Sequence, residues 1–152
     1  MKRPFVTLAS LAMLAATPLI AADTLPWPWK SKMPLDPALV VLSKVSEVTA
    51  SVDKAVVTIS VRADAPTPQY SELQLTPRRG DPKDRIFAFD ARGRAPQETV
   101  PDKIESVTID AAFSDAPIGK FDVIEVYAKE NCQAYSVKDG KTVECTSKAQ
   151  AE

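Results

Sequence analysis

Two cysteines, Cys132 and Cys145, are the residues whose spacing most directly predicts a chemical bond. They flank the turn signal Asp139-Gly140, so we expect them on the two arms of a hairpin. With Asp139-Gly140 alone as the turn, Cys145 faces Ala134, and Cys132 is then one diagonal step away. With Val137 to Gly140 as a four-residue loop, Cys132 faces Cys145 directly and a disulfide forms most easily. A three-residue loop puts the two thiols on opposite faces.

A redox-active dithiol is the competing interpretation of the same pair. The twelve residues between the cysteines are unlike the short Cys-x-x-Cys spacing of that chemistry. The sequence therefore favours a structural disulfide.

A second chemical feature is a group of basic residues in a short stretch: Arg78, Arg79, Lys83, Arg85, Arg92 and Arg94. Such a group suggests a surface for an anion or an acidic partner. The expected strand Ile86 to Asp90 separates its two halves by about 17 Å, because each residue of a strand rises about 3.3 Å. This separation favours solvated loop charges, partly paired with neighbouring aspartates. Arg78, Arg79 and Arg94 are the candidate partner contacts of this group.

The third feature is the aromatic pair in Trp27-Pro28-Trp29, which holds both tryptophans of the chain. Pro28 keeps the segment extended, so the two rings project in different directions. An aromatic pair on a stiff arm can stack on a sugar or enter a groove of a partner protein. The alternative is that the arm folds back and one indole covers an apolar edge of the domain. We treat Trp27 and Trp29 as candidate partner-binding residues.

The chain contains no histidine, which removes the Ser-His and Cys-His nucleophile pairs, His-ligated metals and imidazole proton transfer. A glycosidase-like pair of carboxylates needs only two acids across a cleft, but no pair is marked by its spacing. Asp110 and Asp122 suit an outward face, whereas Glu125 lies among Val123 and Tyr127, where a charge needs a partner. We therefore predict no enzyme, no catalytic residue, no cofactor and no metal site.

Residues 1–22 have the features of a secretory signal peptide: a basic start at Lys2 and Arg3, a mostly apolar run and small residues before Asp23. The expected mature chain has 17 basic and 20 acidic residues, a net charge of −3. That charge argues against nucleic acid or anionic lipid as a partner, and no membrane span is expected after processing. A periplasmic or secreted location is oxidising, which supports the disulfide.

Three regions follow the signal peptide. Residues 23–44 form a proline-containing and tryptophan-containing arm, in which 37–44 suit a short helix and a strand equally well. Residues 45–145 alternate apolar and polar positions repeatedly, and residues 146–152 form a polar tail. With Asp53-Lys54 as a turn, Val52 faces Ala55 and every apolar residue of this hairpin lies on one face.

Further short strands are expected near residues 70–75, 86–90, 104–113, 121–128, 132–137 and 141–145. The strand at 121–128 is apolar on both sides, as a central strand is. Short connections rich in Pro, Gly, Asp or Ser favour antiparallel pairing. Seven to eight strands predict an all-β fold, an antiparallel two-sheet β-sandwich of immunoglobulin-like or fibronectin-like type.

This architecture favours an exported, noncatalytic binding or accessory module of the bacterial envelope. Its expected partner is another envelope or extracellular protein, or a glycan. One alternative is a periplasmic chaperone or inhibitor that pairs with a client through a strand edge. The other is a carboxylate-dependent hydrolase, which requires two acids converging in a pocket.

Overall fold

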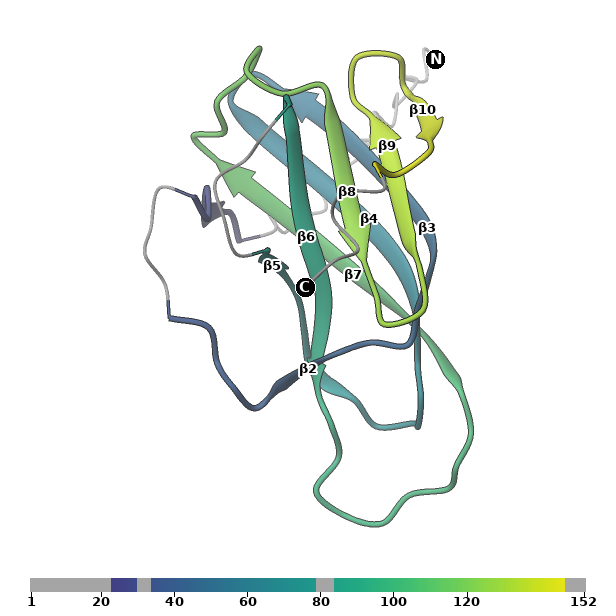
Figure 1. Ribbon diagram of the computed structural model, residues 1–152. Coiled ribbons are helices and arrows are strands. Elements are labelled where there is room, and N and C mark those ends of the chain that lie inside the picture. Colours follow the sequence, from purple (N-terminus) through teal and green to yellow (C-terminus); the bar gives the residue numbers. More distant parts are fainter. Residues whose placement is uncertain (1–22, 30–33, 79–83, 147–152) are drawn as a thin grey trace, which may run out of the picture.

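A computed structural model describes residues 23–29, 34–78 and 84–146, which form two packed sheets (Figure 1). Sheet A has the order β1-β7-β4-β3, made of β1 (Leu25–Pro26), β7 (Glu105–Ser114), β4 (Val56–Ala65) and β3 (Lys44–Asp53). Sheet B has the order β10-β9-β8-β6-β2 with β5 also paired to β6, made of β10 (Lys141–Val143), β9 (Cys132–Ser136), β8 (Val123–Tyr127), β6 (Ile86–Arg94), β2 (Leu39–Val41) and β5 (Ser71–Pro77). Within these described ranges no helix is long and apolar enough to cross a membrane. The prediction of an all-β, two-layer fold is confirmed.

The strand directions correct the prediction of purely antiparallel sheets, because β1 pairs with β7 and β6 pairs with β8 in parallel. The cause lies in the path of the chain. After β6 it crosses to sheet A, runs through β7 and returns to sheet B as β8. Two crossings restore the original direction, so β8 lies parallel to β6. Short connections predict antiparallel neighbours only where consecutive strands share a sheet.

The β3–β4 hairpin keeps its expected apolar face but not its expected register. Val52 pairs with Val57, so the turn is Lys54-Ala55 and not Asp53-Lys54. Lys54 takes the left-handed backbone conformation, with φ of 54°, that this tight turn needs. A shift by two residues leaves each side chain on the same face, so alternation alone does not distinguish the two registers.

The central position of β8 is confirmed, since it lies between β6 and β9. The β9–β10 hairpin pairs Lys141 with Ser136, which makes residues 137–140 a four-residue loop. This register brings Cys132 opposite Cys145, and the two form a disulfide with a Cα–Cα distance of 6.3 Å. Of the three loop lengths considered, the four-residue loop is confirmed.

The core between the sheets centres on Trp27, whose side chain is 1% exposed. Its ring centroid lies 4.9 Å from that of Phe87 in sheet B and 5.6 Å from that of Phe113 in sheet A. It also stacks on Phe121, at 5.7 Å. The indole therefore contacts aromatic residues of both layers.

The arm folds back into the domain, which confirms the alternative considered for it, and the candidate partner contact of Trp27 is corrected because its indole is buried. The segment 23–44 supplies one strand to each sheet, β1 to sheet A and β2 to sheet B. The question of helix or strand at 37–44 is answered by β2, a strand over Leu39–Val41. Trp29 is partly buried on Phe87 and Phe89, and its contact with a partner stays a prediction.

We expect Trp27→Ala to lower the free energy of unfolding by about 3–5 kcal/mol, because it leaves a cavity between the two sheets. Trp27→Phe, the matched control, keeps an aromatic ring and removes an indole N–H that has no acceptor among the described residues, so it loses less. Urea denaturation of both variants measures the difference. Equal losses would show that the ring packing is not what the core needs.

We expect replacement of both cysteines by serine to lower the free energy of unfolding by about 3 kcal/mol, since the bridge restricts the unfolded chain. Urea denaturation with and without a reductant gives the value, and the reduced wild type is the control. Two thiols that react with a thiol reagent in the native protein would contradict the bond.

Candidate binding groove

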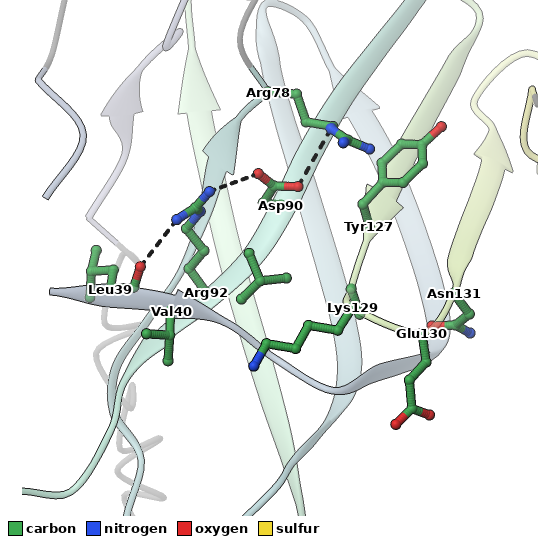
Figure 2. A pocket seen from close by; sticks show the side chains of 11 residues that line it. Leu39, Val40, Arg78, Asp90, Arg92, Tyr127, Lys129, Glu130 and Asn131 are labelled. Atoms are coloured by element: carbon green, nitrogen blue, oxygen red, sulfur yellow. Dashed lines mark hydrogen bonds and ion pairs between the residues drawn. The ribbon is translucent and has the colours of Figure 1, made fainter. Parts of the chain in front are cut away.

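A groove of about 670 Å³ opens on the outer face of sheet B, where β8 and β2 both end. Figure 2 shows the side chains that line it. They come from β2, from β6, from the residue after β5 and from residues 127–131: Leu39, Val40, Val41, Arg78, Asp90, Arg92, Tyr127, Ala128, Lys129, Glu130 and Asn131. We call this set the groove.

The groove exists because two strands share one edge of β6. The first half of β6 pairs with β8, up to Asp90 opposite Tyr127, and the last three residues pair with β2. At the junction, the Leu42 amide donates to the Ala91 carbonyl at 2.9 Å, and the chain then crosses to sheet A. The gap between the last residue of β8, Tyr127, and the last residue of β2, Val41, leaves the side chains of β6 uncovered there.

Asp90 lies at the bottom of the groove between two arginines. Its Oδ1 is 3.6 Å from Arg78 Nε, and its Oδ2 accepts a hydrogen bond from Arg92 at 3.1 Å (Figure 2). Arg92 also donates to the Leu39 carbonyl at 3.1 Å, which ties β2 to β6. The three charged side chains are mostly buried, so these ion pairs are less screened than pairs on an open surface.

The Arg92 guanidinium has a donor left over, because its Nε is buried without a hydrogen-bond partner among the described residues. An unmade hydrogen bond at a buried charged group costs about 1–3 kcal/mol or more. Arg78 has its guanidinium 4.1 Å from the ring centroid of Tyr127, a cation–π contact. Its terminal nitrogens face the groove, beyond the Nε that meets Asp90 (Figure 2).

A buried carboxylate, Glu125, holds the groove residue Tyr127 in position through a hydrogen bond. Its side chain is 1% exposed and accepts hydrogen bonds from the Thr146 amide at 2.7 Å and from the Tyr127 hydroxyl at 2.5 Å. Burial, and then the bond to Glu125, raises the pKa of the Tyr127 phenol, which stays protonated and donates. The prediction that Glu125 needs a partner is confirmed, and its partners are Tyr127 and Thr146, the first residue of the expected tail.

The structure brings together basic residues that sequence spacing places far apart. Arg78 does not lie at the opposite end of the domain from Arg92, because β5 runs antiparallel to β6 and returns Arg78 to the middle of that strand. The Arg78 amide still donates to the Ala88 carbonyl, at 3.0 Å. The expected separation of about 17 Å between the two halves is therefore wrong for this pair, which meets at Asp90.

Arg94, another candidate arginine, does not join the groove. Arg94 is held by two carboxylates, with its NH2 2.8 Å from Asp36 and 2.8 Å from Glu72. Glu72 reaches it from a bulge in β5, where Glu72 has a φ of 48°. Arg79 lies outside the described residues, as do residues 1–22, the expected signal peptide, and residues 147–152 of the expected tail.

Lys129 and Asn131 are groove residues that sequence reasoning missed. Lys129 is exposed and extends toward β2, whereas the Glu130 carboxylate points away from Asp90 (Figure 2). Asn131 exchanges hydrogen bonds with the Val45 backbone at 2.8 and 2.7 Å, which fixes the turn that carries Lys129. No pattern in the sequence marks either residue, because both act through a loop that follows a strand end.

The groove thus directs three cationic groups and one carboxylate toward the same space. This set suits binding of an acidic group through charge-assisted hydrogen bonds. In the part of the chain that is described, no cluster of three acidic or cysteine side chains is placed to hold a metal ion.

We expect Arg94→Gln to raise the pKa of Glu72 more than that of Asp36. The Glu72 pKa is lowered chiefly by its hydrogen bond from Arg94, whereas the Asp36 pKa is lowered chiefly by the Ala38 amide. Both values are depressed by folding, so the stability they contribute is present above the ordinary carboxyl pKa and is lost as pH falls through the lowered values. NMR titration of the side-chain carboxyl carbons measures both shifts, and equal shifts would contradict this order of causes.

No family model matches this chain, and comparison with curated proteins and with solved structures gives no match. The functional argument therefore rests on the chemistry of the groove itself.

Proposed function

We propose that this protein is an exported, noncatalytic binding module of the bacterial envelope, periplasmic or secreted, whose groove takes an acidic group of its partner. One observation carries the proposal: two arginines, Arg78 and Arg92, share the single carboxylate of Asp90, so the groove holds more positive charge than this acid neutralises. A bound carboxylate would accept hydrogen bonds from the terminal nitrogens of Arg78 and would meet Lys129 at the rim (Figure 2).

The state of the acidic residues supports binding over hydrolysis. A carboxylate-dependent hydrolase needs one acid to move a proton and another to act as base or nucleophile. In the groove, both oxygens of Asp90 face guanidinium groups. Glu125 is buried and bonded to Thr146 and Tyr127, so its carboxylate is turned away from solvent. Both acids serve as structural acceptors.

The partner we propose is another envelope or extracellular protein, or a glycan, that presents a carboxylate or a similar anion. Such a contact depends on few charge-assisted bonds and is sensitive to salt. The disulfide between Cys132 and Cys145 is consistent with an oxidising compartment, where the signal peptide would deliver the chain.

An immunoglobulin-like or fibronectin-like kinship of the sandwich is part of the same proposal. Its support is the pairing of β4 with β7 around the β5–β6 hairpin, which lies in the other sheet. A connection of this kind is the Greek-key crossing of those folds. The parallel pair β6–β8 is a departure from their all-antiparallel sheets.

The experiment compares capture of envelope components by immobilised residues 23–152 with capture by two variants. We expect Arg78→Gln combined with Lys129→Gln to lose at least tenfold in captured partner, because two donors of the groove are removed. Arg62→Gln is the matched control, since Arg62 is an exposed arginine on sheet A with one ion pair, to Glu47.

Loss in both the double variant and the control would show nonspecific charge attraction and would overturn the groove. Unchanged capture by both variants would show that the partner does not bind at the groove, and would also overturn the proposal. Capture that persists unchanged at high salt would also contradict an acidic partner group.

A further inference from the structure

The outer edge of β7 is open along most of its length. β1 pairs with this edge only at Phe113 and Ser114, in parallel. The preceding part of β7, residues 105–112, has no strand beside it on this side among the described residues. Sheet A therefore ends in a strand whose backbone groups are only partly used.

The free backbone groups of this edge can be assigned. The Trp27 amide donates to the Ser114 carbonyl at 3.1 Å, so the backbone of Ser114 points toward the edge. Alternate residues of a strand point the same way, so the amides and carbonyls of Ala112, Asp110, Thr108 and Ser106 also face outward. The amides and carbonyls of these four alternate residues can therefore form backbone hydrogen bonds with an added strand.

Beta proteins commonly protect a free edge with a bulge, a proline or a lysine. The other edge of sheet A has such protection. β3 has a bulge between Val45 and Glu47, and the Asn131 side chain forms hydrogen bonds with both the amide and the carbonyl of Val45. β7 has none of these, since its ladder with β4 is unbroken and its sequence contains neither proline nor lysine.

An apolar depression of about 150 Å³ lies beside the open edge, between β5 and β7. Its lining includes Leu73 and Leu75 of β5 and Ile109 of β7, with Leu25 of β1 at its end. Leu25 is 52% exposed. An added strand would place every second side chain over this depression and bury it.

The charge along the edge indicates what occupies it. Asp110 and Glu105 of β7 and Asp23 beside β1 are exposed acids. Asp110 accepts a hydrogen bond from Ser60 at 2.6 Å, Glu105 accepts one from the Gln69 amide at 3.2 Å, and none of the three has an ion pair among the described residues. Of the three, only Asp110 lies on the outer face, because Glu105 and Asp23 alternate onto the face of Ile109 and Leu25. Two copies of this edge would bring Asp110 side chains near each other, which is destabilising, whereas a Lys or Arg on the outer face of an added strand would pair with Asp110.

We propose that the open edge of β7 takes up an extended segment of another protein, with apolar residues facing the depression and Lys or Arg on the outer face. The segment lies along residues 105–112 as the next strand of sheet A, continuing the line of β1. This activity uses a surface separate from the groove. It gives a physical site to strand-edge pairing, the chaperone or inhibitor alternative noted from the sequence.

The probe is an eight-residue peptide, blocked at both ends, that alternates lysine and valine, added to the full mature chain. We expect hydrogen exchange at the amides of residues 106, 108, 110 and 112 to slow at least tenfold. Thr108→Pro removes one outward amide without breaking a bond to β4, so it should abolish this protection. Thr108→Val keeps the amide and is the matched control, which should retain it.

A second variant keeps the test decisive if Thr108→Pro fails to fold. Asp110→Lys changes an exposed side chain and should reverse the preference, so that a peptide alternating glutamate and valine binds at least tenfold better than the lysine peptide. No protection of β7 by the lysine peptide in the wild type would overturn the proposal. Equal binding of both peptides to the wild type would overturn the charge argument, and self-association through β7 would replace the proposed occupant by a second copy.

Discussion

The fold depends on one side chain that fills the space between the two sheets. Trp27 contacts Phe87, Phe113 and Phe121, so it joins sheet A, sheet B and the connection between β7 and β8. Burial of an indole contributes several kcal/mol, a large share of the stability of a domain of this size. Trp27 belongs to the segment before the first long strand, so this N-terminal arm is part of the core. The same arm contributes β1 to sheet A and β2 to sheet B.

Much of the architecture follows from local pattern. The two-layer all-β fold, the shared apolar face of β3 and β4, and the central place of β8 are all readable from alternation and two-sided apolarity. The disulfide register follows from parity, because only some loop lengths let Cys132 meet Cys145. These features depend on neighbours in the sequence, where pattern carries the information.

The alternation of apolar and polar residues does not predict which distant segments pair with each other. The parallel pair β6–β8 depends on the chain visiting sheet A in between, and the meeting of Arg78 with Arg92 depends on β5 returning along β6. Lys129 and Asn131 belong to the groove only because β2 stops where β8 ends. The need of Glu125 for a partner was readable from its apolar neighbours, but Thr146 as that partner was not, since it lies beyond the last strand.

The location of the central tryptophan also bears on how the chain folds as it is synthesised. Trp27 emerges early, whereas two of its ring partners, Phe113 and Phe121, lie far along the polypeptide and emerge late. The same delay applies to β1, because it pairs with the last two residues of β7, Phe113 and Ser114. Such distant contacts slow folding. The β3–β4 hairpin is therefore synthesised while its apolar face is still uncovered, and the core between the sheets closes only after Phe121 has been made.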